Sequence, residues 1–349
     1  MSFHYNKRIR VMIVDDSMLA RRIINDGLSK YKNIEVVGES VNARDARAKI
    51  PILKPDVITS DVEMPGMSGI DFVKNILPEY PIPIILVSSL DLRVFDALAV
   101  GAVDFVRKPD GMNGKERFIE SLANKIVIAS CSRVRKRQNA VMMGTSPASK
   151  LTFTPQLSNE IIIALGASTG GTEATLDVLK RLPANTPGMV IVQHMPPGFT
   201  KMYADRLDKS CALNVKEAKT GDIIKSGQVL IAPGDKHMTV VKTGTNYTVN
   251  CQAGPKVSGH CPSVDVLFKS MAENVRCRMA GIIMTGMGSD GANGLLAMKQ
   301  KGAFTIGQDK DSCVVYGMPM VAQNIGAVTV QASCENIAGV LIRKLNQWR

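Results

Sequence analysis

The first 130 residues alternate between short apolar runs and segments with helical periodicity. The runs are rich in Val and Ile, as strands buried on both faces of a parallel sheet are. Ser17, Ser68 and Asp91 stand where the intervening helices would begin, and each residue type can act as a helix N-cap. Five such strand–helix units predict a doubly wound, five-stranded parallel sheet. The predicted strands cover residues 10–14, 34–38, 57–60, 83–87 and 103–106.

The same alternation resumes at residue 160 and continues to the C-terminus. Between residues 238 and 251, two Val-rich alternating runs flank Thr-Gly-Thr-Asn, which is typical of a β-hairpin. The pattern predicts a second doubly wound α/β domain with a mainly parallel sheet and one hairpin. Core strands are expected at 161–165, 188–192, 229–232, 281–285 and 303–307, and helices at 263–275, at 292–301 and from about residue 335.

A segment of different composition separates the two regions. It begins with the basic residues Arg133, Arg135, Lys136 and Arg137, continues with turn-prone residues, and contains no acidic residue. Such a segment is typical of a tether between domains. We therefore predict a first domain at 8–128, a linker at 129–158 and a second domain at 159–349.

The formal net charge of +12 is unevenly distributed along the chain. Lys and Arg exceed Asp and Glu by 1 over residues 1–130, by 5 over 131–158 and by 6 over 159–349. A basic second half favours an acidic partner, either nucleic acid or an acidic protein surface. No helix-turn-helix pattern with a basic recognition helix supports nucleic acid. A solvated run of charges explains the linker cluster equally well.

Composition limits the classes of protein that the chain can belong to. The seven cysteines form no C-x-x-C pair, and we interpret them as reduced thiols in a cytoplasmic protein. The four histidines form no H-x-x-x-H pair, which argues against a zinc site. No apolar run reaches the ~18 residues of a membrane span, and the polar N-terminus lacks the apolar core of a secretory signal. We expect a cytoplasmic location and no membrane insertion.

Polar residues of related chemistry follow the predicted strands of the first domain. Asp15 and Asp16 close the first strand, Asp61 the third and Ser88 the fourth, while Lys108 follows the fifth. The carboxyl ends of parallel strands share one edge of a sheet, so these side chains are expected to meet there. Three carboxylates held together need a cation, and Mg²⁺ suits an all-oxygen site. One carboxylate can then act as a nucleophile toward phosphorus.

On these residues, the segment 8–128 resembles the receiver domain of two-component response regulators, which has a flavodoxin-like fold. The resemblance implies that Asp61 accepts a phosphoryl group from a histidine kinase, and that Phe105 occupies the aromatic switch position. It also implies Mg²⁺ ligands at Asp15, Asp16, Asp61 and the backbone carbonyl of Glu63, with Ser88 and Lys108 contacting the phosphoryl oxygens.

The first predicted strand of the second domain ends in Gly166-Ala167-Ser168-Thr169-Gly170, which fits the pattern G-x-S-x-G. That pattern places a nucleophilic serine on a sharp turn above a parallel sheet. Its glycines allow the turn and leave room for a substrate carbonyl. The alternative is a glycine-rich turn in which Ser168 only caps the following helix.

Two further strands end in residues that complete a site for a serine nucleophile. His194 follows the strand at 188–192, and Asp290 follows the strand at 281–285. Because parallel strands end at one edge of the sheet, His194 can take the proton of Ser168 while Asp290 orients the imidazole. The amide of Thr169 and the Met287-Gly288 peptide are candidates for stabilising an oxyanion.

Alternatives exist for these residues. His194 is also explained as a turn residue and Asp290 as a helix N-cap, and His237 and His260 lie in loops and compete for the role of base. A dinucleotide-binding turn is disfavoured because the next strand ends in Gln193-His194 rather than in an acid. The order Ser, His, Asp along the chain differs from that of α/β-hydrolases, so an esterase of that fold is not expected.

Residues 160–349 resemble the catalytic domain of the chemotaxis protein-glutamate methylesterase family, CheB. The matching stretches are 166–171, 193–199, 232–234, 262–268, 285–294 and 308–319. The resemblance implies a triad of Ser168, His194 and Asp290. The chain departs from the family pattern at Cys261, where the family has arginine, and at Met320, where it has a charged residue. Neither departure touches the implied triad.

The two resemblances together imply a phosphorylation-activated serine hydrolase of chemotactic adaptation. Its substrates would be methylated glutamates of chemoreceptors, released as glutamate and methanol, and specific receptor glutamines, which it would deamidate. A chemotaxis histidine kinase would be the phosphodonor, with Mg²⁺ needed in the receiver and no cofactor for the ester step. Two rivals remain, a receiver-controlled nucleic-acid binder and a non-catalytic protein that only binds receptors.

Overall fold

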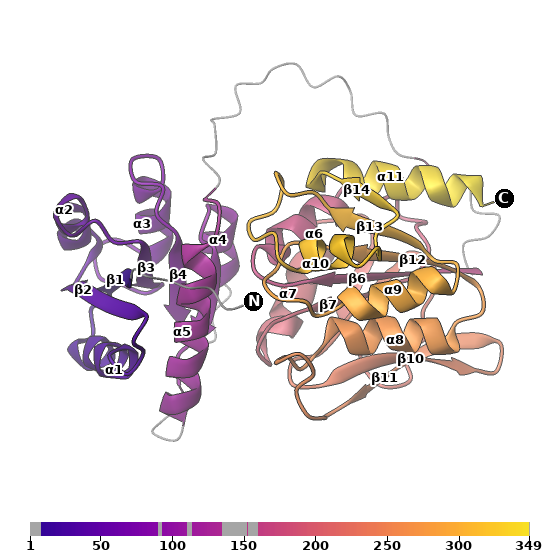
Figure 1. Cartoon of the computed structure of the whole chain (residues 1–349), viewed down its shortest axis with the longest axis horizontal. Coiled ribbons are helices and arrows are strands. Elements are labelled where there is room, and N and C mark those ends of the chain that lie inside the picture. Colours follow the sequence, from indigo (N-terminus) through magenta and orange to yellow (C-terminus); the bar gives the residue numbers. More distant parts are fainter. Residues whose placement is uncertain (1–7, 90–92, 110–113, 135–151, 153–159, 349) are drawn as a thin grey trace, which may run out of the picture. The chain divides into compact units, whose positions relative to one another are not determined.

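The computed structural model describes residues 8–89, 93–109, 114–134, 152 and 160–348 (Figure 1). The chain divides into two compact units, Met1–Met143 and Gly144–Arg349. Asp91 and most of the predicted linker lie outside the described residues. Among the described residues, no helix combines the length and the apolar character needed to cross a membrane.

The first unit is a five-stranded parallel sheet between two layers of helices (Figure 1). The strand order is β2-β1-β3-β4-β5, so the order reverses between β1 and β3. Each strand begins or ends within two residues of its predicted bounds: β1 (Ile9–Val14), β2 (Ile34–Ser40), β3 (Val57–Asp61), β4 (Ile84–Ser88) and β5 (Asp104–Arg107). Helices α1 (Met18–Leu28) and α5 (Lys115–Ser130) cover one face, and α2 (Ala43–Leu53), α3 (Gly69–Ile76) and α4 (Arg93–Ala99) cover the other.

Two of the predicted helix starts in this unit are confirmed by their hydrogen bonds. The side chain of Ser17 accepts a hydrogen bond from the backbone of Ala20 at the start of α1. The side chain of Ser68 does the same for Asp71 at the start of α3. Both caps fix the loops that follow β1 and β3, where the acidic residues lie.

The second unit contains a seven-stranded sheet in which every pair of neighbours is parallel. The order is β14-β13-β12-β6-β7-β9-β8. The hairpin of β10 (His237–Thr243) and β11 (Asn246–Gln252) forms a separate two-stranded sheet, as predicted. The strands are β6 (Ile161–Ala167), β7 (Met189–Gln193), β8 (Asn214–Glu217), β9 (Gln228–Ile231), β12 (Arg278–Ile283), β13 (Phe304–Gln308) and β14 (Val330–Ala332).

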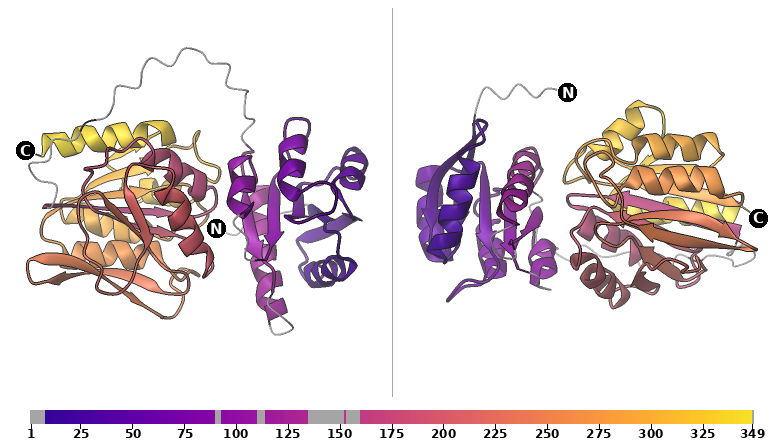
Figure 2. Two further views of the ribbon diagram at one scale, coloured as in Figure 1. Left: turned by 180° about the vertical axis from the view of Figure 1, so that it is seen from behind. Right: turned by 90° about the horizontal axis from the view of Figure 1, so that it is seen from below.

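Helices cover both faces of this sheet (Figure 2). One layer contains α8 (Val264–Asn274), α9 (Ala292–Gln300) and α10 (Met318–Asn324), and the other contains α6 (Gly171–Leu179), α7 (Phe199–Asp208) and α11 (Cys334–Gln347). The hairpin packs against α8. The hydrophobic pattern did not predict α7, α10, β8 or β14, which are short or interrupted by polar residues.

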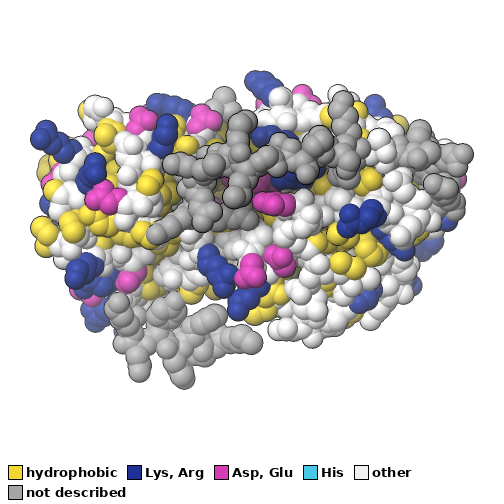
Figure 3. Space-filling model, turned by 90° about the horizontal axis from the view of Figure 1, so that it is seen from above, with side chains coloured by type: hydrophobic (Ala, Val, Ile, Leu, Met, Phe, Trp, Pro, Cys, Tyr) yellow, Lys and Arg dark blue, Asp and Glu magenta, His cyan; other side chains and the backbone are white. Residues whose placement is uncertain are grey.

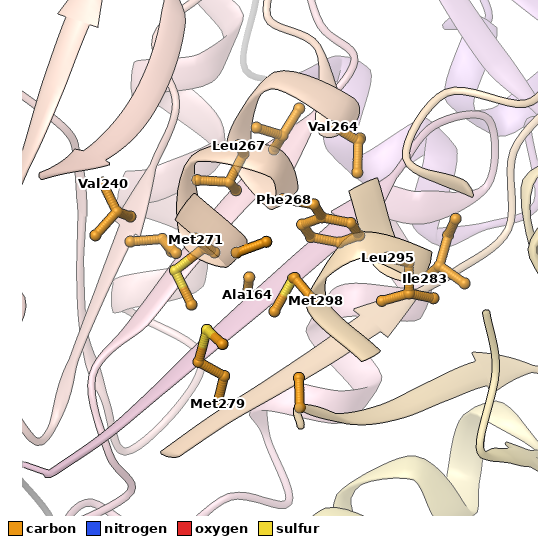
Figure 4. Packing of buried hydrophobic residues seen from close by; sticks show 14 of the residues in the cluster. Ala164, Val240, Val264, Leu267, Phe268, Met271, Met279, Ile283, Leu295 and Met298 are labelled. Carbon is orange, nitrogen blue, oxygen red and sulfur yellow. The ribbon is translucent and has the colours of Figure 1, made fainter. Parts of the chain in front are cut away.

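The largest buried cluster of this unit joins α8 and α9 to the sheet (Figure 4). Phe268 of α8 and Leu295 and Met298 of α9 are fully buried above Ala164 of β6. Burial of this kind contributes about 1.5–3 kcal/mol for each large side chain. It holds the first turns of both helices near the carboxyl edge of the sheet, where Ser168 and His194 follow their strands.

Candidate active site

Ser168 lies where the strand order of the second sheet reverses. It directly follows β6, which has β7 on one side and β12 on the other. Its backbone N–H donates to the carbonyl of Thr285 at 2.9 Å, and its side chain is partly exposed. Open α/β sheets bind their ligands beyond the strand ends at such a reversal. The position suits a nucleophile that a substrate must reach.

The turn that carries Ser168 is held by buried side chains on both sides. The amide of Gln193 donates to the carbonyl of Ser168 at 2.8 Å. The hydroxyl of Thr285 donates to the carbonyl of Thr169 at 3.0 Å. Gly170, with φ of 76°, is the N-cap of α6, and no side chain caps that helix. The interpretation of Ser168 as a helix cap is therefore wrong.

His194 and Asp290 form a buried hydrogen-bonded pair beside this turn. The two atoms that join them, His194 Nε2 and Asp290 Oδ2, are 2.8 Å apart, and the side chains are 7% and 1% exposed. His194 follows Gln193, which pairs with Ala167 across β6 and β7. His194 and Ser168 therefore leave neighbouring strands at the same level. Within the described residues, His194 Nδ1 is buried and has no hydrogen-bond partner.

Asp290 also forms hydrogen bonds with the first turn of α8 and with its N-cap, Ser263. Its carboxylate accepts hydrogen bonds from the Ser263 hydroxyl at 2.7 Å and from the backbone N–H groups of Val264 at 2.7 Å and Asp265 at 3.0 Å. The N-terminus of a helix favours a negative charge at this place. Asp290 is not the N-cap of the helix that follows it, because Gly291 occupies that position in α9.

These contacts keep Asp290 ionised. Burial on its own would raise the pKa of Asp290, but the hydrogen bond and charge of His194, together with the hydrogen bonds from Ser263 and Asp265, outweigh burial and lower it. An ionised Asp290 accepts from His194 Nε2–H, so the tautomer with an unprotonated Nδ1 is favoured. In that tautomer, Nδ1 of His194 has a lone pair that can accept a proton.

The other two candidates for the base, His237 and His260, make different contacts. His237 Nδ1 accepts a hydrogen bond from the Ser263 backbone at 3.2 Å, so its Nε2–H donates to the Pro255 carbonyl at 2.8 Å. Both nitrogens of His237 are therefore used to hold a loop. His260 stacks on His194, with ring centroids 3.7 Å apart. Asp290 makes its histidine contact with His194.

The oxyanion candidates lie in the loop between β12 and α9 and in the Ser168 turn. Gly288 is exposed and has a φ of 86°, which favours glycine. A Cβ on Gly317 would lie 3.0 Å from Gly288 N, so Gly317 allows close packing beneath this loop. In the part of the chain that the structure describes, the N–H groups of Met287 and Gly288 donate no hydrogen bond. Thr169, Met287 and Gly288 stay predictions for this role.

The acidic residues of the first unit come together as expected. Carboxylate oxygens of Asp15, Asp16 and Asp61 lie within 4.8 Å of one another. Lys108 Nζ is 2.7 Å from Asp61 Oδ2 and 3.1 Å from Asp15 Oδ2. Ser88 Oγ is buried and has no hydrogen-bond partner among the described residues. The cluster has the all-oxygen donor set that hard divalent cations prefer.

Burial controls the protonation of this cluster. Burial raises the pKa of Asp15 and of Asp61, and the nearby Lys108 offsets the rise only in part. Burial would lower the pKa of Lys108, yet its hydrogen bond to Asp61 and the charges of both carboxylates raise it. The positive charge of Lys108 therefore offsets only part of the negative charge of Asp15, Asp16 and Asp61. A divalent cation would neutralise the remaining negative charge.

Two other predicted residues of this unit have defined surroundings. The backbone N–H of Glu63 donates to Asp61 Oδ1 at 3.2 Å, and its side chain pairs with Arg93. The metal contact of its carbonyl stays a prediction. Phe105 is buried, with its ring edge-on to Phe95 at a centroid distance of 6.4 Å.

Sequence reasoning missed the residues that support the site. Ser263, Thr285 and Gln193 hold Asp290 and the Ser168 turn, but none belongs to a motif of catalytic residue types. A signal existed only for Ser263, because a serine after proline at the start of a predicted helix indicates an N-cap. It does cap α8, by accepting from Val266.

Comparison with known proteins identifies the family of each unit. The family model for CheB methylesterase matches residues 163–341, and the model for the response regulator receiver domain matches residues 11–117. The protein-glutamate methylesterase/protein-glutamine glutaminase 2 of Syntrophomonas wolfei is 50% identical over 345 residues, which cover 98% of this chain and 99% of that protein. The corresponding protein of Salmonella typhi is 43% identical, with 97% of each chain covered.

A solved structure gives the same result for the second unit. The catalytic domain of CheB methylesterase from Thermotoga maritima is 38% identical, with a TM-score of 0.51. The match covers 52% of this chain and 97% of that domain. This chain therefore belongs to the CheB family of protein-glutamate methylesterase/protein-glutamine glutaminases, with a response regulator receiver domain ahead of the methylesterase domain.

Proposed function

We propose that this chain hydrolyses glutamate methyl esters and deamidates glutamine side chains on chemoreceptors, with Ser168, His194 and Asp290 as its catalytic residues. The observation that supports this most directly is the buried His194–Asp290 pair. Among the described residues Nδ1 of His194 has no hydrogen-bond partner, and His194 and Ser168 directly follow the paired residues Gln193 and Ala167 of neighbouring strands. Methanol release from methylated receptors, measured with the full chain, tests the proposal. No release from receptors that carry methyl groups would contradict it.

In the first step, Ser168 Oγ attacks the ester carbonyl carbon and passes its proton to His194 Nδ1. Asp290 holds Nε2–H and stabilises the imidazolium that forms. The N–H groups of Thr169 and of the Met287-Gly288 peptide would donate to the carbonyl oxygen as it becomes negative. Collapse of the tetrahedral intermediate breaks the bond to the methoxy group, and the proton on His194 leaves with methanol.

In the second step, water attacks the acyl-serine and gives its proton to His194 Nδ1. The acyl–oxygen bond breaks, Ser168 recovers a proton, and the product is a free glutamate side chain. A glutamine substrate follows the same course with ammonia as the leaving group. The use of Nδ1 toward the serine suits this fold. Nδ1 is the ring nitrogen nearer the backbone, and Ser168 leaves the strand next to that of His194.

The receiver domain would control this chemistry through phosphorylation of Asp61 by a chemotaxis histidine kinase. Asp15, Asp16, Asp61 and the carbonyl of Glu63 would hold Mg²⁺, which when bound neutralises charge on the phosphoryl oxygens. The Ser88 hydroxyl, which has no hydrogen-bond partner among the described residues, and Lys108 Nζ would contact those oxygens. Ser88 donates a hydrogen bond in this role, and Lys108 contributes its positive charge.

Loss of the Asp61 carboxylate should remove control by phosphorylation. A small phosphodonor with Mg²⁺ should raise methanol release by the natural chain, on the order of tenfold if the active arrangement is initially populated to about 10%. The Asp61→Asn variant should show no such stimulation. Asp26→Asn, at a 72% exposed position on α1, should keep it. Equal stimulation of Asp61→Asn would exclude Asp61 as the acceptor.

Separation of the predicted domains should release the methylesterase from inhibition. We propose that the unphosphorylated receiver, residues 8–128, covers the catalytic face of residues 159–349, and that the linker at 129–158 permits its departure. A fragment of residues 150–349 should then release methanol faster than the unphosphorylated full chain. A fragment no faster than the full chain would contradict inhibition by the receiver.

Charge agrees with an acidic protein as substrate. The second domain has an excess of 6 basic residues, and demethylated or deamidated receptor helices become more acidic. Lys and Arg are interspersed with Asp and Glu on the face shown in Figure 3, rather than gathered in one basic patch. Steeply salt-dependent DNA binding would favour the nucleic-acid rival instead. Covalent labelling of Ser168 by a serine-directed inhibitor would exclude a non-catalytic receptor binder.

We also propose that the protein is located in the cytoplasm. All seven cysteines are free thiols in the structure. Free thiols are typical of a reducing compartment, and the proposed phosphodonor and receptor sites lie in the cytoplasm.

A further inference from the structure

His260 contacts the proposed base through its ring face and has no role in the mechanism above. Its imidazole stacks on that of His194 with ring centroids 3.7 Å apart and an angle of 11° between the ring planes. His260 is only partly exposed, and the His194 side chain is 7% exposed. A parallel stack of this closeness restricts the tilt of both rings.

The loop that carries His260 is held by hydrogen bonds on both sides of that residue. Val257 and His260 exchange two backbone hydrogen bonds of 2.9 Å across a two-residue turn. The turn residues Ser258 and Gly259 have φ angles of 52° and 84°, the pattern of a type I′ turn. Three positions after His260, the Ser263 hydroxyl donates to Asp290. His260 is therefore placed by backbone hydrogen bonds before it and by the Asp290 contact after it.

His237 fastens the same loop to the hairpin. It accepts from the Ser263 backbone through Nδ1 and donates to the Pro255 carbonyl through Nε2. These two contacts join the beginning and the end of the loop to the first residue of β10. One loop thus carries both the partner of Asp290 and the ring that stacks on His194.

His194 needs such support because its known hydrogen bond fixes only one point. The contact with Asp290 is made at Nε2, on one edge of the ring, and it leaves the ring able to tilt about the line from Nε2 to Asp290 Oδ2. Nδ1 has no hydrogen-bond partner among the described residues that could prevent this motion. A flat ring stacked on its face opposes it.

We propose that His260 is a positioning residue, whose ring face holds the His194 imidazole so that Nδ1 stays directed at the Ser168 hydroxyl. The inference rests on the proposed function of Ser168 and His194. It assigns His260 no proton transfer and no contact with substrate. The role is assigned to the face of its ring.

Three variants of the full chain test this role through methanol release from methylated receptors. His260→Ala and His260→Asn remove the ring and should lower kcat about 10- to 100-fold, since small misplacement of a catalytic group costs about 10²-fold. KM should stay within about twofold of its natural value, because substrate binding is unchanged. His260→Phe restores a flat ring without nitrogens and should recover kcat to within about threefold of the natural chain.

The outcomes separate this role from others. A natural kcat in His260→Ala, an effect confined to KM, or His260→Phe as impaired as His260→Asn would each overturn the proposal. If His260→Ala fails to fold, the comparison of the Asn and Phe variants decides, with thermal unfolding of the second unit as the check that each variant is folded. Ser168→Ala is measured alongside. If Ser168→Ala retains activity, the proposed triad is contradicted. If Ser168→Ala is inactive and His260→Ala is fully active, only the positioning role of His260 is contradicted.

Discussion

Replacement of Ser168 by alanine is expected to lower the rate of methanol release about 10⁴-fold or more, the scale seen when a serine nucleophile is removed from a triad. The variant keeps His194, Asp290 and the proposed oxyanion donors but has no side-chain oxygen that can form the proposed acyl intermediate. The loss should appear in kcat. Release of radiolabelled methanol from methylated receptors measures it.

The matched control for this experiment is Ser210→Ala. Ser210 follows α7 and precedes β8, at the edge of the sheet opposite Ser168. That variant should release methanol at the natural rate. Phosphorylation of Asp61 should be the same in both variants, because the receiver unit is untouched. A Ser168→Ala chain that retains more than about a tenth of the activity would remove Ser168 from the mechanism.

Replacement of Asp290 by asparagine is expected to lower kcat about 10⁴-fold, because it reverses the tautomer of the base. All four hydrogen bonds to the Asp290 carboxylate come from donors: Ser263 Oγ, the backbone of Val264 and Asp265, and His194 Nε2. An asparagine NH₂ group must face at least one of these donors. If it faces His194, Nε2 becomes the acceptor and Nδ1 carries the proton, so Nδ1 cannot take the proton of Ser168.

The same variant should also be less stable. The pKa of Asp290 is lowered in the folded chain, so its carboxylate stabilises the fold above its unfolded pKa, and this contribution is lost as pH falls through the folded pKa. Asp290→Asn loses it at neutral pH, and thermal unfolding measures the difference. Asp177→Asn, at a partly exposed position of α6, is the control. A fall in kcat of less than tenfold in Asp290→Asn would contradict the orienting role.

The proposed nucleophile and the proposed base are each supported by side chains of other segments. Thr285 supports the Ser168 turn through its hydroxyl, and Gln193 supports it through its amide. His194 is supported by Asp290 and by the stacked His260. Effects of residues that act as one unit are not additive. A double variant of Ser168 and His260 should therefore be no less active than Ser168→Ala alone.

The sequence by itself determined the strands and what stands at their ends. Short continuous runs of Val and Ile differ from the helical pattern, in which apolar residues recur every three or four positions. These runs predicted β1 to β7, β9, β12 and β13 to within a few residues of their bounds. Once the strands are parallel, their carboxyl ends must share an edge. Ser168, His194 and the acidic residues Asp15 and Asp61 are strand-end residues, so their gathering follows from local pattern and one rule of topology.

Only the tertiary structure decided the contacts between segments that local pattern does not connect. Asp290 binds the first turn of α8, which begins 26 residues earlier in the chain, and no periodicity links the two. The structure also decided which nitrogen of His194 meets Asp290, that His237 holds a loop, and that His260 stacks on His194. These choices depend on how α8 and the hairpin pack over the sheet. Packing is a property of the whole core. Residue types at strand ends could therefore name the candidates for the site and favour His194, but they could not show what His237 and His260 contact or which nitrogen of His194 meets Asp290.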